Sequence, residues 1–142
     1  MVETTIKSLD KSMTKTLEWI NDLSEDIGYT DKQHTYLVLK SVLHALRDRL
    51  TIEEATDLAA QLPLVIKGIY YDEYNPSKTP IKAKNEEEFY AMVDRGLKNN
   101  PEISSEQITP IVLGFLARRI GGDEIVHVIS NLPPKIAALW VK

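Results

Sequence analysis

The stretch VLHALRDRL at residues 42–50 returns as VLGFLARRI at residues 112–120, and this match determines how we interpret the chain. A shift of 70 residues aligns residues 13–71 with residues 83–141 without a gap. Identical pairs at this offset include Arg49/Arg119, Leu62/Leu132 and Pro63/Pro133. Self-similarity at a fixed offset is the signature of repeated structural units. The chain is therefore predicted to contain two copies of one unit.

The quoted stretch has the apolar spacing of a helix. Apolar residues recur at three- and four-residue steps, which places them on one helical face: Leu39, Val42, Leu43, Leu46 and Leu50. An earlier segment around Trp19 is helical by the same criterion and is expected to end near Gly28. Thr51 and Glu54 have the spacing of a capping box, which predicts that a third helix begins there.

Prolines divide the third segment of each unit. Pro63 and Pro133 interrupt a helical pattern, so each is expected to kink its helix or to begin a new short one. No segment alternates apolar and polar residues with a period of two, so no sheet is expected. The predicted fold is an all-α bundle built from two tandem three-helix repeats.

The whole chain, residues 1–142, is predicted to form a single domain. Residues 1–12 are polar and are expected to be a frayed or loosely docked tail. Residues 13–71 form the first unit, and residues 83–141 form the second by self-alignment. Residues 72–86 contain two prolines and mostly polar side chains, which predicts a linker. Each unit alone is small, so the two are expected to share a core.

Composition excludes several classes of function. The 142 residues include no cysteine, which removes disulfides, cysteine-based zinc sites, iron–sulfur clusters and thiol catalysis. A net charge of −4 argues against broad nucleic-acid binding. The longest apolar run, residues 111–117, is far shorter than the roughly 20 residues that cross a bilayer, so no membrane association is expected. With neither signal nor transit peptide in the N-terminal residues, the expected location is the cytoplasm.

The most charged group of residues lies where the quoted stretch ends. One interpretation is an anion site in which Arg47 or Arg49 binds a phosphate or carboxylate. The other is a structural network of ion pairs at a helix corner, with Arg49 facing Glu53 and Glu54. Because Arg49 and Glu54 both recur in the second unit, the structural interpretation is favoured for that pair.

Residues that differ between the units are the better functional candidates. Arg47, Asp48 and His44 correspond to Ala117, Arg118 and Gly114, and they form the candidate anion or interaction site. Tyr71 and Tyr74 belong to the same site if they line a groove, although they could instead hold the linker against the bundle. The histidines are scattered and no catalytic or cofactor-binding motif is present. We therefore predict no cofactor and no metal, and we assign no catalytic residue.

Two motifs carry a resemblance to a known family. They are the segment LHALRDRLT at residues 43–51 and the segment AAQLPLVIKGIYY at residues 59–71. With these motifs the chain resembles the bacterial and archaeal family catalogued as domain of unknown function 2267. The resemblance implies a small all-α protein and transfers no catalytic residue. The chain departs from the family pattern at Tyr74, where a tryptophan is common.

Two functions remain open from the sequence. The first is a non-enzymatic interaction or regulatory module whose partner is another protein. The second is a binder of, or an enzyme acting on, a small anionic ligand in a pocket between the two units. Paired arginines would favour the first, and unpaired polar side chains around a cavity would favour the second. A nucleic-acid role ranks third, because it needs Lys98, Arg118 and Arg119 to converge on one face.

Overall fold

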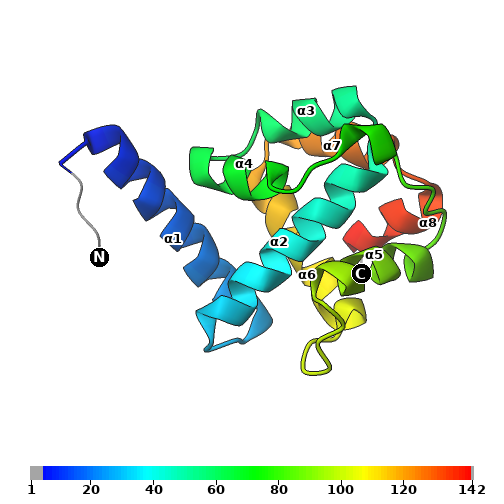
Figure 1. Cartoon of the computed structure of the whole chain (residues 1–142), viewed down its shortest axis with the longest axis horizontal. Helices are drawn as coiled ribbons and strands as arrows, with labels where there is room; N and C mark the ends of the chain where they lie inside the picture. The colour runs from blue at the N-terminus through cyan, green and yellow to red at the C-terminus, as the bar shows by residue number, and fades with distance from the viewer. Residues whose placement is uncertain (1–4, 142) are drawn as a thin grey trace.

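The computed structural model describes residues 5–141. Within that part of the chain it consists of α-helices joined by turns, with two short 3-10 segments and no strand (Figure 1). The all-helical fold that the apolar spacing predicts is therefore confirmed. None of the described helices is both long enough and apolar enough to span a membrane.

The first half of the chain contains four helices. They are α1 (Lys7–Ile27), α2 (Lys32–Arg49), α3 (Ile52–Ala59) and α4 (Leu64–Tyr71). Gly28 ends α1 with a φ of 87°, in the left-handed region that glycine adopts without strain, as the sequence predicts. Thr51 begins α3 with the predicted capping box: its hydroxyl accepts from the Glu54 amide at 3.3 Å, and the Glu54 carboxylate accepts from the Thr51 amide at 2.9 Å.

The second half has a parallel order of elements. After the 3-10 turn η1 (Pro76–Lys78) come α5 (Glu86–Gly96), α6 (Ser105–Arg119), α7 (Gly122–Ser130), α8 (Pro134–Ala137) and the 3-10 segment η2 (Ala138–Val141). Pro63 and Pro133 each stand directly before a new helix, at the N-cap, where the missing amide of proline costs no hydrogen bond within the helix. The third segment of each half is thus two helices instead of one bent helix.

One hydrophobic core draws on both halves of the chain. Across the middle of the molecule α2 packs most extensively against α5, and α3 also contacts α7. The approach of α5 to α2 is close at Gly96, where a Cβ atom would lie 2.9 Å from the Cβ atom of Ser41. The two halves therefore form one packed body.

The start of α1 differs from the expectation. Residues 7–12, which we expected to be a loosely docked tail, are helical, and residues 1–4 of that tail lie outside the described part of the chain. The reason is an apolar spacing that the polar composition obscures: Leu9, Met13 and Leu17 follow at four-residue steps. The first half of α1 projects away from the other helices (Figure 1), and Thr16 is its first buried residue.

Candidate functional site

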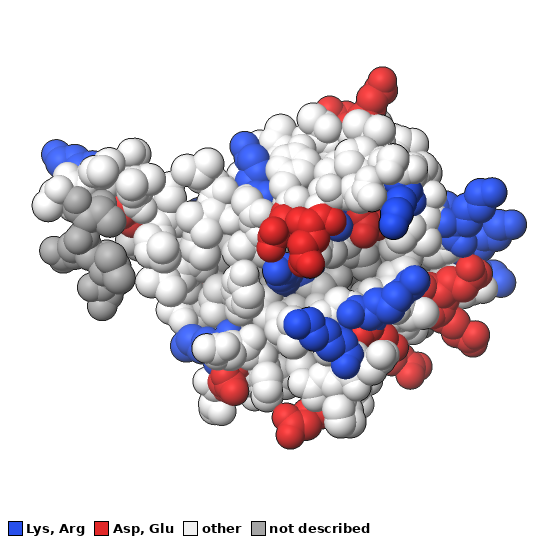
Figure 2. Space-filling view, in the orientation of Figure 1, with Lys and Arg blue, Asp and Glu red and all other residues white. Residues whose placement is uncertain are grey.

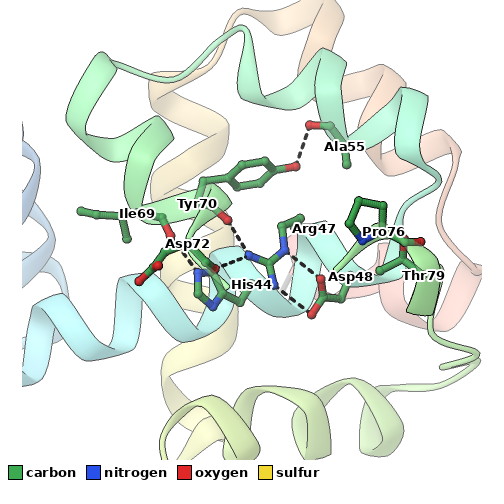
Figure 3. A network of polar contacts seen from close by, with 9 residues as sticks. All are labelled: His44, Arg47, Asp48, Ala55, Ile69, Tyr70, Asp72, Pro76 and Thr79. Atoms are coloured by element: carbon green, nitrogen blue, oxygen red, sulfur yellow. Dashed lines mark hydrogen bonds and ion pairs between the residues drawn. The ribbon is translucent and has the colours of Figure 1, made fainter. Parts of the chain in front are cut away.

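Three of the candidate residues lie on the last two turns of α2. His44 and Arg47 are three residues apart and therefore share a helix face. Both side chains point to the end of α4, and Asp48 lies beside Arg47 (Figure 3). The candidate site is thus a junction between α2 and the C-terminus of α4.

Arg47 uses its guanidinium group entirely within the protein. The residue is 2% exposed. Its Nε and Nη2 atoms donate to the two carboxylate oxygens of Asp48 at 2.7 and 3.1 Å, a bidentate pair. Its Nη1 atom donates to the carbonyl oxygens of Tyr70 at 2.7 Å and Asp72 at 2.8 Å. Carbonyls at a helix C-terminus lack partners within the helix, so Arg47 caps α4.

His44 contributes a second cap to the same helix end. Its Nε2 atom lies 2.7 Å from the carbonyl oxygen of Ile69. Burial lowers the pKa of His44 below its ordinary value of 6.5, and the neighbouring charge of Arg47 lowers it further. The contact is the one that a neutral imidazole makes when its Nε2–H donates to a carbonyl. His44 is therefore placed as a neutral donor that helps to hold α4 on α2.

The tyrosines at the end of α4 and just after it pack around this junction. Tyr70 belongs to the core, as expected, and its hydroxyl donates to the carbonyl oxygen of Ala55 at 2.7 Å. The ring of Tyr74 lies 4.9 Å from the Arg47 guanidinium carbon, a cation–π distance. The rings of Tyr71 and Tyr74 are 5.9 Å apart. All five candidate residues, His44, Arg47, Asp48, Tyr71 and Tyr74, are thus brought together, and we name them the α2–α4 cluster.

The recurring arginines do not form the corner network that we expected. Arg49 makes no ion pair with Glu53 or Glu54 among the described residues, since the Glu54 carboxylate serves the capping box. Its Nε atom instead donates to the carbonyl oxygen of Ala83 at 2.7 Å, which holds the linker on α2. The equivalent Arg119 pairs with Asp22 of α1. The two arginines thus have equivalent positions and different partners.

A hollow of about 290 Å³ lies beside the cluster, between α2 and α5. Its lining includes His44, Arg47, Asp48, Glu73, Met92 and Arg95. An adjoining hollow of about 510 Å³ includes Lys40, which donates to the Asp72 carboxylate at 3.0 Å. That hydrogen bond raises the pKa of Lys40 and lowers the pKa of Asp72. Figure 2 shows acidic and basic side chains interspersed on this face, so the hollows carry no single sign of charge.

The described residues contain no group of three or more histidine, aspartate or glutamate side chains that could hold a metal ion. Arg95 is exposed on α5, and Lys98 follows that helix. Arg118, by contrast, pairs with Asp26 and belongs to the contact between α6 and α1.

A surface feature that we did not expect from the sequence lies on α1. The side chains of Leu9, Met13 and Leu17 are 47%, 41% and 39% exposed, and they follow one another along the projecting part of the helix. We name these three residues the α1 face. The four-residue spacing of these residues indicates one face of a helix, but the polar residues between them obscured this pattern in the sequence.

These features define a small all-α protein in which buried polar groups join one helix to the next. The chain belongs to the family described as uncharacterized conserved protein (DUF2267), whose model matches residues 16–139. The match includes the whole α2–α4 cluster and begins at Thr16, the first buried residue of α1, so that it contains Leu17 but not Leu9 or Met13 of the α1 face. No curated protein matches the chain.

Proposed function

We propose that this protein is a non-enzymatic interaction module that binds another protein through the α1 face. The observation that carries the proposal is the exposure of Leu9, Met13 and Leu17 on a projecting helix. They continue the apolar stripe that Ile20 and Leu23 bury further along α1, yet they remain exposed. Contiguous exposed apolar side chains are typical of surfaces at which proteins bind partners.

The α2–α4 cluster supports the same proposal, because its polar groups are used within the protein. Each nitrogen of the Arg47 guanidinium donates to Asp48 or to a carbonyl at the end of α4. Four of the five N–H donors of Arg47 are used in this way, and the residue is 2% exposed, so little of it is available to a phosphate or carboxylate ligand. The cluster thus supplies structure, and the exposed apolar side chains supply the surface for recognition.

Affinity capture from native lysate tests this proposal. The wild-type chain is compared with the double variant Leu9→Lys/Met13→Lys, and bound proteins and small molecules are identified by mass spectrometry. The matched control is Ile52→Lys/Val126→Lys, which replaces two other exposed apolar side chains, 52% and 64% exposed. We expect protein partners that the α1 variant loses and the control keeps. A set of partners that all three proteins share would refute the proposal.

The hollow between α2 and α5 favours a second function, the binding of a small anion. Arg95 and His44 line it, in a position between the two halves of the chain. Asp48 and Glu73 line the same hollow, and their charge opposes an anion. Titration with inorganic phosphate, followed by NMR, tests this function. It predicts saturable shifts at Arg95 that are absent from Arg95→Met.

We also propose that the two halves are tandem copies of one unit and that they form a single domain. We further propose that the protein is cytoplasmic. The helix bounds support the repeat, because α2 and α6 end at Arg49 and Arg119, at the offset of the sequence match. The shared core supports the single domain. Expression of residues 1–80 alone tests the single domain. We expect no cooperative unfolding of this fragment, because α2 then lacks α5, the helix against which it packs.

A further inference from the structure

We propose that a hollow between α1 and α6 binds a small organic carboxylate, with Arg118 as the residue that binds its charge. The hollow has a volume of about 580 Å³. It lies at the end of α1 opposite to Leu9 and Met13, so the inference goes beyond the proposed function. We name it the α1–α6 hollow, and its lining residues are Asp26, Pro110, Ile111, Gly114, Arg118 and Trp140.

Arg118 has hydrogen-bond donors to spare, in contrast to Arg47. Its side chain is 61% exposed. The Nη2 atom donates to the Asp26 carboxylate, and the guanidinium group makes no other hydrogen bond within residues 5–141. The Nη1 atom lies beside Gly114, where an added Cβ atom would be 3.7 Å from it. A guanidinium fork with free N–H groups is well suited to binding a carboxylate.

Small residues on α6 explain why a hollow exists here. At the 70-residue offset between the two halves, Gly114 corresponds to His44 and Ala117 corresponds to Arg47. In the first half, those two longer side chains cap the end of α4. Glycine has no side chain and alanine has only a methyl group, so neither can reach as far from α6. The second half therefore leaves space where the first half places its own donors.

The rest of the lining selects a carboxylate that carries an apolar body. Pro110, Ile111 and the ring of Trp140 offer apolar surface beside Arg118, and binding pockets commonly combine such surface with a few polar groups. The indole nitrogen of Trp140 is buried and donates to no acceptor in the described part of the chain. An unpaired buried donor is unfavourable. Since the nitrogen is covered, the half-buried ring must turn for a ligand oxygen to accept from it.

Asp26 does not exclude an anion from the hollow. It is the one acidic residue of the lining, and Arg118 balances its charge. Both side chains are partly exposed, and ion pairs of this kind contribute little to stability, so the guanidinium can share its donors with a ligand. A cation gains less at this place, because it must compete with Arg118 for the Asp26 carboxylate.

NMR titration with phenylacetate tests the proposal, because this probe joins a carboxylate to an aromatic ring. The chain contains two tryptophans, so its spectrum has two indole N–H signals. Trp19 lies in the core and Trp140 lines the hollow. We expect a saturable shift of the Trp140 signal, while the Trp19 signal stays in place. Phenethylamine, which joins a cation to the same ring, should leave both signals unchanged.

Two pairs of variants locate the binding. Arg118→Met should weaken phenylacetate binding by at least about tenfold, because it removes a charged hydrogen-bond donor. The matched control is Arg95→Met, which removes another exposed arginine and should bind as the wild type does. Gly114→His should abolish binding by filling the hollow with the residue of the first half. Gly114→Ala should retain it, since the added Cβ atom meets Arg118 at an ordinary contact distance.

Three results would overturn the inference. The first is a Trp140 signal that phenylacetate does not shift in a saturable way. The second is an equal response to phenethylamine, which would show that the ring alone binds. The third is a loss of binding in Arg95→Met but not in Arg118→Met, which would place the anion in the hollow between α2 and α5. None of these results bears on the capture of partners by the α1 face, so each proposal can fail separately.

Discussion

The α2–α4 cluster and the α1 face are opposite kinds of surface feature. The cluster contains the residue types most often found in functional sites, yet Arg47 and His44 donate to carbonyls at the end of α4 and to the Asp48 carboxylate. The α1 face contains only Leu9, Met13 and Leu17, and the fold leaves all three exposed. Residue chemistry alone therefore does not mark a site. What matters is which groups the fold leaves without a partner.

The largest loss of stability is expected when Arg47 is replaced. Methionine is about as long as arginine but has no hydrogen-bond donor. The Arg47→Met substitution therefore leaves Asp48 and two carbonyls at the end of α4 without the donor that Arg47 provides. We expect a loss of about 3 kcal/mol in the free energy of unfolding, because an unpaired group is costly in a buried position. Urea unfolding measures it, with the exposed Arg95→Met as control. Equal midpoints for the two variants would show that Arg47 does not hold α4.

Tyr70→Phe is expected to have the next largest effect. The substitution removes only the hydroxyl that donates to the Ala55 carbonyl, at a fully buried position. We expect a loss of about 1–2 kcal/mol, the cost of leaving a buried acceptor unsatisfied. Thermal unfolding is the measurement, and Tyr36→Phe on the exposed side of α2 is the control. If Tyr36→Phe lowered the melting temperature as much as Tyr70→Phe, the loss of stability could not be assigned to the hydrogen bond of Tyr70.

His44 makes the cluster sensitive to pH. Because burial lowers the pKa of His44 in the folded protein, the unfolded chain binds more protons just below pH 6.5. The stability contribution of this residue is therefore complete above that pH and falls as the pH decreases through it. We expect His44→Gln to flatten this part of the stability profile, measured by urea unfolding between pH 7.5 and 5.5. Parallel profiles for wild type and variant would contradict the assignment.

Much of the fold could be predicted from the sequence, because its determinants are local. Gly28, the Thr51 capping box and the breaks at Pro63 and Pro133 act within one helical turn, and each is found where the spacing predicts it. The exception is the start of α1, where lysines and serines obscured a regular apolar spacing.

The partners within the site could not be predicted, because most of them are backbone atoms. Arg47 donates to the carbonyls of Tyr70 and Asp72, more than 20 residues away, and every residue type has a carbonyl. Arg49 shows the same limit: its acceptor is the carbonyl of Ala83 in the linker, while the nearby Glu54 is already engaged. The sequence grouped residues that the structure places side by side, but it could not show that most of their donors are used within the protein.

The smallest expected effect on stability is at the α1 face, and it gives the most direct test of the account. The measurement is the urea-unfolding midpoint of Leu9→Lys/Met13→Lys beside that of Arg47→Met, at the same protein concentration. We predict that the α1 variant unfolds within about 0.5 kcal/mol of the wild type, as exposed substitutions usually do, and that Arg47→Met unfolds much earlier. The reverse order would contradict the account, because the fold would then depend on the α1 face and not on the α2–α4 cluster.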